Sequence, residues 1–210
     1  PIFLNLIHEG LCVIKSLINK VSQGKHLDEQ ESYTCLSTIL SGAVSQDEVT
    51  LLLKKLFEKG EYVDEVVGFA RAMREQSIKV LLSGDPMDLC GTGGSGKSRF
   101  NVSTAAAFVL AAMGVPVAKH GNRGSLKPNG SFDFLEALGI PVDVSLDVSK
   151  TLYKQFGLCF LFARNHHPGM KYVGPSRKEI GHRTIFNCLG PLCSPASVTY
   201  QIIGTIDVQV

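Results

Sequence analysis

Residues 91 to 98 read GTGGSGKS and could bind a phosphate group. They satisfy the phosphate-loop pattern G-x-x-x-x-G-K-[ST], in which a lysine and a hydroxyl residue follow a run of glycines. Glycine lets the backbone fold back so that several N–H groups point at one anion, and the N-terminus of a following helix adds partial positive charge. The loop therefore predicts a phosphate-bearing ligand.

A nucleoside triphosphatase is one interpretation of this loop. Such enzymes also need a buried strand that ends in an aspartate, which helps to hold Mg²⁺. The best buried strand after the loop, Leu158–Phe162, runs into Ala163-Arg164 instead, and Ile206-Asp207 is a poor substitute. The triphosphatase is the weaker interpretation, because a short motif alone gives many false matches.

The blocks that follow the loop favour a different phosphate-binding function. The loop continues into FNVST at Phe100–Thr104, KHGNR at Lys119–Arg123 and GSFD at Gly130–Asp133, and further on comes PSRKEIGHRTIFNCLGPL. In type and order these blocks resemble the anthranilate phosphoribosyltransferase family, whose loop reads GTGGDG. The segments KGEYVDEV and ARAMRE fit the small helical domain of that family, so the resemblance covers essentially the whole chain.

The resemblance implies transfer of a phosphoribosyl group from phosphoribosyl pyrophosphate to the amine of anthranilate, an early step of tryptophan biosynthesis, with Mg²⁺ as cofactor. Departure of pyrophosphate adds negative charge to the leaving group, so catalysis would come from positioning and electrostatic stabilisation. The amine is unprotonated at neutral pH, so no general base is needed and no catalytic residue is assigned. The donor-binding residues implied by the resemblance are Gly91, Gly94, Ser95, Arg99, Asn101, Val102, Ser103, Thr104, Lys119, Asn122, Lys127 and Ser131.

Several of these residues have a plain structural alternative. Asn101, Ser103 and Thr104 open a helix and could simply cap it, although the resemblance also implies that Ser103 contacts Mg²⁺. Lys119 would pair with phosphate oxygens, or would be a solvated lysine at a strand end. For the acceptor, a guanidinium suits the carboxylate because it offers two parallel N–H donors. The acceptor residues implied by the resemblance are Gly91, His120, Asn122 and Arg177.

The sequence departs from the family's pattern in its phosphate-binding loops. The usual aspartate is Ser95, the usual small hydroxyl residue is Arg99, and the family's serine-rich run is GSLKPN at 124–129. We expect the added positive charges of Lys97, Arg99 and Lys127 to compensate for the lost hydrogen-bond donors. The family's Asp-Glu pair, which completes the Mg²⁺ site, lies beyond the last residue, so Ser103 is the one Mg²⁺ ligand that we expect.

An α/β domain must position these residues. After Asp85-Pro86, short apolar segments alternate with helical ones, which predicts a parallel sheet of βαβ units. Ligands bind such sheets beyond the carboxyl ends of the strands, where the two polar loops would lie. The expected strands are Met87–Cys90, Val115–Ala118, Leu158–Phe162 and Tyr200–Ile206, and the expected helices are Ser103–Met113, Phe132–Leu138 and Asp147–Phe156.

The chain up to about residue 82 is helical in pattern, with a capping box at Ser45 and Glu48. The fold class is therefore α/β, with a small all-α N-terminal domain and an α/β domain that is incomplete at its C-terminus. We expect a helical domain of the dimerisation type over 1–82, joined by 165–195. The donor-binding α/β domain would cover 83–164 and 196–210, and the resemblance suggests a homodimer.

Composition and charge argue against some classes of partner and site. The net charge is only +2, which argues against nucleic acid as the main partner. The six cysteines form no C-x-x-C pair, which indicates buried free thiols rather than zinc ligands or disulfides. His166-His167 and His182 lack a third ligand nearby and are interpreted as structural. Without a basic leader or a membrane-length apolar run, we expect a cytoplasmic protein.

Two other functions remain open from the sequence. Pyrimidine nucleoside phosphorylases share the two-domain layout and similar loops, although the KHGNR block and Arg177 favour the anthranilate branch. Some relatives of the family look like nucleic-acid binders, and the altered loops carry extra Lys and Arg. The near-neutral charge balance weighs against that second alternative.

Overall fold

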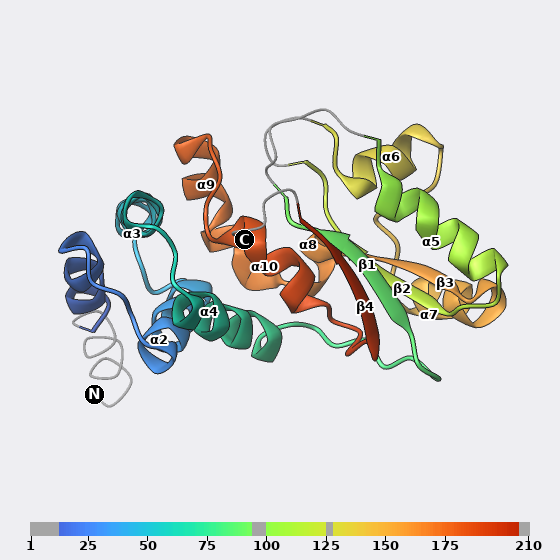
Figure 1. Ribbon diagram of the computed structural model, residues 1–210, viewed down its shortest axis with the longest axis horizontal. Coiled ribbons are helices and arrows are strands. Elements are labelled where there is room, and N and C mark those ends of the chain that lie inside the picture. Colours follow the sequence, from blue (N-terminus) through green and yellow to red (C-terminus); the bar gives the residue numbers. More distant parts are fainter. Residues whose placement is uncertain (1–12, 94–99, 125–127, 206–210) are drawn as a thin grey trace. The chain divides into compact units, whose positions relative to one another are not determined.

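The computed structural model describes residues 13–93, 100–124 and 128–205. The chain divides into two compact units, each of which contains two separate stretches of sequence (Figure 1). The first unit comprises Pro1–Gln76 and Pro168–Leu189, and the second comprises Ser77–His167 and Gly190–Val210. A segment of about twenty residues therefore leaves the second unit, joins the first and then returns.

The first unit is helical. Its elements are a helical segment over residues 13–22, then α2 (Glu29–Leu40), α3 (Gln46–Lys59) and α4 (Val63–Glu75), and from the returning segment η1 (Pro168–Tyr172), α9 (Gly174–Ile180) and α10 (Phe186–Leu189). The capping box predicted before α3 is confirmed, because the Glu48 N–H donates to Ser45 Oγ and the Ser45 N–H donates to the Glu48 carboxylate.

A buried ion pair ties α3 to α4. Lys59 Nζ lies 2.7 Å from Glu65 Oε2, and the two side chains are only 6% and 0% exposed. The Glu65 carboxylate also accepts hydrogen bonds from the N–H groups of Leu27 and Tyr62, at 3.0 and 2.8 Å. Because its oxygens are satisfied by both a cation and backbone donors, the carboxylate can stay charged in the core.

The second unit is built on a four-stranded sheet in the order β3-β2-β1-β4, and every neighbouring pair is parallel. This confirms the parallel sheet expected from the alternating pattern. The strands end together: Gly91 pairs with Gly204, and Gly121 pairs with Phe162. The strands are β1 (Met87–Gly91), β2 (Val117–Gly121), β3 (Leu158–Phe162) and β4 (Tyr200–Gly204).

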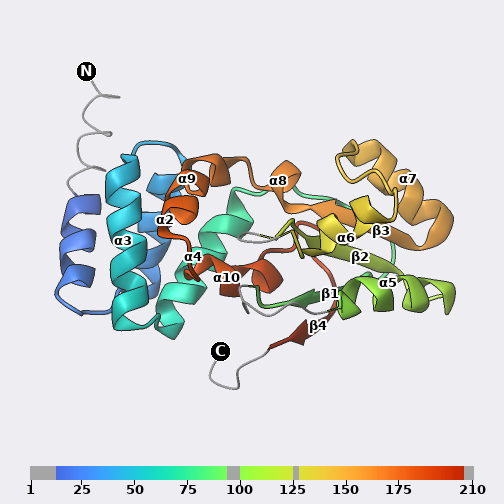
Figure 2. The ribbon, with the colours of Figure 1, turned by 90° about the horizontal axis from the view of Figure 1, so that it is seen from above.

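Helices cover both faces of this sheet, as Figure 2 shows for α5 (Val102–Ala112) and α7 (Leu146–Phe156). On one face, Ala107 of α5 packs with Leu89 and Val117. On the other face, Tyr153 of α7 packs with Ala118 and Leu161. A third cluster joins Phe132 and Leu135 of α6 (Ser131–Ala137) to Phe162. Adjacent strand residues thus face opposite layers.

The position of β2 was predicted wrongly. The expected strand was Val115–Ala118, whereas β2 spans Val117–Gly121. Gly114 has a φ of +87° and ends the preceding helix, and Pro116 has no N–H to give to a sheet. At the other end, Lys119 and His120 continue the strand although they are polar. In the part of the chain that the structure describes, no helix is long and apolar enough to cross a membrane.

Candidate functional site

The loops after β1 and β2 begin at the same edge of the sheet, because the parallel strands end in register. Gly91 is exposed there beside Gly204, whose carbonyl accepts a 2.9 Å hydrogen bond from Thr92 N. This edge is where parallel sheets bind ligands. Four predicted donor-binding residues lie outside the described residues, namely Gly94, Ser95, Arg99 and Lys127.

The start of α5 offers an uncommitted amide. Asn101 is the N-cap residue, but its side chain makes no capping hydrogen bond; its backbone carbonyl instead accepts from the N–H groups of Thr104 and Ala105, both at 3.0 Å. Capping therefore does not account for the Asn101 side chain, whose amide has no hydrogen-bond partner among the described residues. Thr104 is buried, Ser103 is half-buried and Val102 is exposed, so Val102 could contact a ligand chiefly through its backbone.

Lys119 is buried inside β2, only 2% exposed, and is not the solvated strand-end lysine of the alternative interpretation. Its Nζ donates a 2.6 Å hydrogen bond to the carbonyl of Leu89. Burial lowers the pKa of this ammonium, while the nearby Cys90 and Asp88 raise it. No carboxylate of a described residue lies within ion-pair distance of Lys119 Nζ, although the buried Asp88 is near enough to interact with its charge.

Asp88 is a buried acid that sequence reasoning missed. Its Oδ1 accepts a 3.0 Å hydrogen bond from His120 N, and its Oδ2 accepts a 3.2 Å bond from the Gln201 side chain. Burial raises the pKa of Asp88, and the charge of Lys119 opposes that rise. The carboxylate thus links β1, β2 and β4. A charged residue within an apolar strand was the available signal.

His120 presents one unsatisfied ring nitrogen. Its Nδ1 lies 3.2 Å from the carbonyl oxygen of Gly190, which assigns the proton to Nδ1 and leaves a lone pair on Nε2. Nε2 is buried and has no hydrogen-bond partner among the described residues. Burial, and then the neighbouring His167, lower the pKa of His120 to about 3, so the ring is neutral at physiological pH. It can accept a hydrogen bond.

His167 lies next to His120, with the ring centroids 5.3 Å apart and the rings nearly edge to face. The sequence interpretation of His166-His167 as purely structural did not foresee this contact. Each of the two has a backbone partner, because His166 Nδ1 lies 3.0 Å from the Ile78 carbonyl and His167 Nε2 lies 3.1 Å from the Cys193 carbonyl. The sequence predicted that the two adjacent histidines point apart. The contact between His167 and His120 could be found only from the folded structure.

Asn122 and Ser131 are brought together after β2. Ser131 Oγ donates to the Asn122 carbonyl at 3.3 Å, and the Phe132 N–H donates to the same oxygen at 3.2 Å. A Cβ at Gly121 would lie 2.2 Å from Ser131 Oγ, so any larger residue there would force this hydroxyl to move. Both residues have polar side-chain atoms near the carboxyl end of β2, where a bound phosphate compound could contact them.

One carboxylate oxygen of Asp133 binds both ends of the loop between Gly124 and Gly130. Asp133 Oδ2 accepts hydrogen bonds from the N–H groups of Gly124 and Gly130, at 2.7 and 2.8 Å. A Cβ at Gly130 would meet three backbone atoms of residues 122–124 at 2.4 to 2.5 Å. Nearby, the Arg123 guanidinium pairs with Glu136 and lies 4.8 Å from the centroid of Phe162. Arg123 is thus committed to the protein.

Arg177 belongs to the helical unit, on α9, whereas the other described site residues belong to the α/β unit. It is half-buried, and burial lowers the pKa of its guanidinium. The guanidinium lies 5.5 Å from the Phe186 ring centroid. It has no ion-pair partner within the described residues of the chain, so its fork of donors is open to a carboxylate.

The described residues do not by themselves form a magnesium site. They contain no group of three or more His, Cys, Asp or Glu side chains that could hold a metal ion. From the predicted set only the Ser103 hydroxyl remains, and one neutral oxygen is a weak ligand set for Mg²⁺. Cys90 is not a nucleophile either, because burial raises the pKa of its thiol to about 11.

Two protein-family models match the chain, one for each unit. Residues 83–210 match the model described as "Glycosyl transferase family, a/b domain", and residues 15–77 match "Glycosyl transferase family, helical bundle domain". The chain is 46% identical over 192 residues to an anthranilate phosphoribosyltransferase of Bacillus caldotenax, an alignment that covers 91% of this chain and 79% of that protein.

Solved structures of anthranilate phosphoribosyltransferases are similar to the chain. The anthranilate phosphoribosyltransferase of Thermus thermophilus has a TM-score of 0.84 at 41% identity, with 92% of this chain and 59% of that chain covered. The Saccharomyces cerevisiae enzyme, solved with phosphoribosyl pyrophosphate and Mg, has a TM-score of 0.83 at 28% identity, with 94% and 60% covered. It has also been solved with 4-fluoroanthranilate.

The chain therefore spans about three fifths of the length of these solved relatives. The match to the family models extends over both units. The chain belongs to the anthranilate phosphoribosyltransferases of this glycosyl transferase family.

Proposed function

We propose that the protein transfers the phosphoribosyl group of phosphoribosyl pyrophosphate to the amine of anthranilate, giving N-(5-phosphoribosyl)anthranilate and pyrophosphate, in tryptophan biosynthesis. The observation that carries this proposal is Lys119: a buried ammonium at the carboxyl edge of the sheet, bonded to a carbonyl and not to a carboxylate. An anion at this edge would offset the free-energy cost of burying that charge.

The donor's phosphates would lie against the strand edge. Lys119, the backbone at Gly91 and the uncommitted Asn101 amide would contact phosphate oxygens, and Asn122 and Ser131 would contact the donor from the second loop. As the bond to pyrophosphate breaks, negative charge grows on the leaving group. Preorganised donors stabilise that charge more strongly than water does, since they need no reorganisation. The described residues do not provide a Mg²⁺ site, so no step is assigned to the ion.

The acceptor would use the neutral ring of His120 and the open guanidinium of Arg177. We propose that Arg177 binds the anthranilate carboxylate and that His120 Nε2 accepts a hydrogen bond from the amine. An acceptor at this position keeps the amine's own lone pair free to attack. The imidazole is not required as a base, because the aniline nitrogen is unprotonated before it reacts.

The helical unit, Pro1–Gln76 with Pro168–Leu189, would serve in dimerisation, and we propose a homodimer. We also propose a cytoplasmic location. Its support is chemical: the described cysteines are free, and burial raises the pKa of Cys35 and Cys159 to about 12, so they are protonated, inert thiols.

The test is loss of anthranilate fluorescence in the presence of phosphoribosyl pyrophosphate and Mg²⁺. Replacing Lys119 with methionine should lower kcat/KM for the donor about a hundredfold, because a charge-assisted contact to phosphate disappears. Lys154→Met, on the exposed side of α7, is the matched control and should leave the rate unchanged. A folded protein without turnover would refute the proposed reaction, and an unchanged Lys119→Met rate would refute the role of Lys119.

A further inference from the structure

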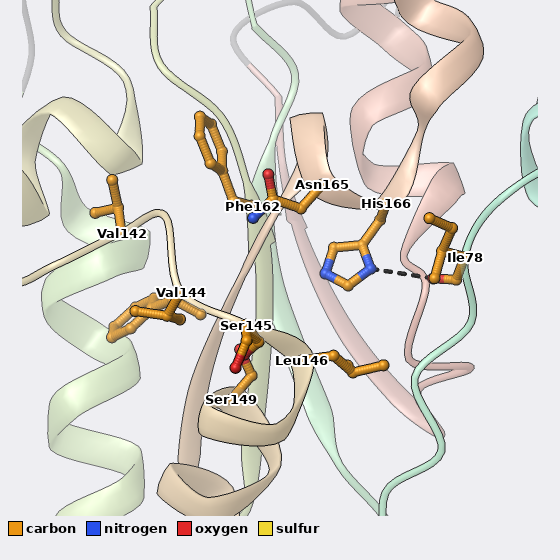
Figure 3. A pocket seen from close by; sticks show the side chains of 10 residues that line it. Ile78, Val142, Val144, Ser145, Leu146, Ser149, Phe162, Asn165 and His166 are labelled. Carbon is orange, nitrogen blue, oxygen red and sulfur yellow. Dashed lines mark hydrogen bonds between the residues drawn. The ribbon is translucent and has the colours of Figure 1, made fainter.

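A cavity lies in the α/β unit. It has a volume of about 250 Å³ and is lined by residues from the start of α7, the end of β3 and the short helix α8 (Ala163–His166), as Figure 3 shows. None of the described residues assigned to donor or acceptor binding lines it. The cavity is therefore a feature that the proposed reaction does not use.

The walls of the cavity are largely apolar, with Val142, Leu146 and Phe162 around it. Its two serine hydroxyls are committed to the protein. Ser145 Oγ caps α7 by accepting from the Val148 N–H at 3.3 Å, and Ser149 Oγ donates to the Ser145 carbonyl at 3.3 Å. These hydroxyls add little unsatisfied polarity to the cavity.

Besides the two serines, the polar side chains of the lining are Asn165, whose Nδ2 donates a 3.0 Å hydrogen bond to Asp143 Oδ1, and His166. His166 is only 5% exposed, and its Nδ1 lies 3.0 Å from the Ile78 carbonyl, which places the proton on Nδ1. Figure 3 shows the other ring nitrogen turned away from Ile78 and toward the cavity. No described residue is a hydrogen-bond partner of this Nε2, whose lone pair therefore faces the cavity. Burial lowers the pKa of His166, so the ring stays neutral.

The absence of charged side chains among the described lining residues favours an uncharged ligand. No Lys, Arg, Asp or Glu among the described residues lines the cavity, so it offers a charged molecule no counter-ion, and desolvating a charge there would be costly. A volume of about 250 Å³ is small for a ligand site, since drug-sized ligands occupy roughly 300 to 1,000 Å³. It suits a single fused ring system.

We propose that this cavity binds a small neutral aromatic molecule of about the size of indole, which donates one N–H or O–H hydrogen bond to Nε2 of His166. The rings of the ligand would pack against Leu146 and Phe162, and its donor would hydrogen-bond the Nε2 lone pair of His166. Binding at this place requires neither phosphoribosyl pyrophosphate nor anthranilate.

Two probes that differ by one methyl group test the hydrogen bond. Titrations of the chain with indole and with 1-methylindole, followed by NMR of the histidine ring nitrogens, omit both substrates, so the result is independent of the proposed reaction. We expect indole to bind with a Kd on the order of a millimolar. 1-Methylindole, which has no donor, should bind about tenfold more weakly and leave the His166 Nε2 resonance in place.

Two variants locate the site. Val144→Phe fills the cavity and should weaken indole binding at least tenfold, whereas Val148→Phe places the same side chain on an exposed position of α7 that does not line it and should leave the Kd unchanged. Equal affinity for the two probes, an indole-induced shift that spares His166, or equal losses in both variants would each overturn the proposal. NMR spectra of the free variants verify that both are folded.

Discussion

His120 predicts a specific loss of stability in mild acid. In the folded protein burial lowers its pKa to about 3, whereas an unfolded chain has the ordinary value of 6.5. Below pH 6.5 the unfolded state therefore takes up a proton that the folded state refuses, and stability falls as the pH drops from 6.5 toward 3. For these two pKa values the linkage relation gives a loss of about 2 kcal/mol between pH 7 and pH 5, and about 3 kcal/mol by pH 4.

The measurement is the free energy of urea unfolding at pH 7 and pH 5, for the wild type and for His120→Asn. The variant loses the titrating ring, so its drop between the two pH values should be smaller by about 2 kcal/mol. Because only the difference between pH values is compared, a general destabilisation of the variant cancels. His182→Asn is the matched control, since that histidine is exposed, and it should show the wild-type drop.

The ring itself can be followed directly. In an NMR titration the Hε1 resonance of His120 should show no inflection between pH 7 and pH 4.5. The burial argument fails if His120→Asn loses as much stability as the wild type on acidification, or if the His120 ring titrates near pH 6.5.

Three further changes test the positioning of the site and the fold. Gly130→Ala should destabilise the protein by about 2 kcal/mol or more in urea unfolding, because its Cβ would overlap backbone atoms, while Gly174→Ala, with open space around it, should be nearly neutral. Glu65→Ala should cost about 3 to 5 kcal/mol by leaving a lysine charge buried, against less than about 1 kcal/mol for the exposed Glu58→Ala; similar losses would contradict the importance of burial. Asp133→Ala should raise KM for the donor and lower the melting temperature, since two N–H groups lose their acceptor; an unchanged KM would exclude a positioning role.

The architecture was predictable where hydrophobic periodicity was strong. The alternation of strands and helices after residue 86 correctly indicated a parallel sheet, and the glycine-rich loop correctly followed its first strand. The error at β2 came from the same method, because a hydrophobic pattern stops where Lys119 begins. Burial of a lysine depends on contacts across the sheet, such as its bond to the Leu89 carbonyl, and no local pattern encodes those.

The site was predictable only in its contiguous parts. The blocks around Asn101, Lys119 and Asn122 could be recognised as motifs, and the structure brings Asn122 and Ser131 into contact. The partners of Asp88 and His167 could not be assigned from the sequence, because they lie on other elements of the fold; His120 N, which Asp88 accepts from, is 32 residues away in the chain. Only the folded sheet makes them neighbours.

The single carboxylate oxygen of Asp133 has a consequence for how this sequence could have diverged. By clasping the N–H groups of Gly124 and Gly130, it fixes both ends of the segment independently of the side chains between them. The family's serine-rich run could thus be exchanged for GSLKPN without displacing Asn122 or Ser131. When both ends of a loop are held in this way, its ligand-contacting side chains can be exchanged without changing the neighbouring elements. Residues 125–129 are therefore the place to insert the corresponding sequence of a relative.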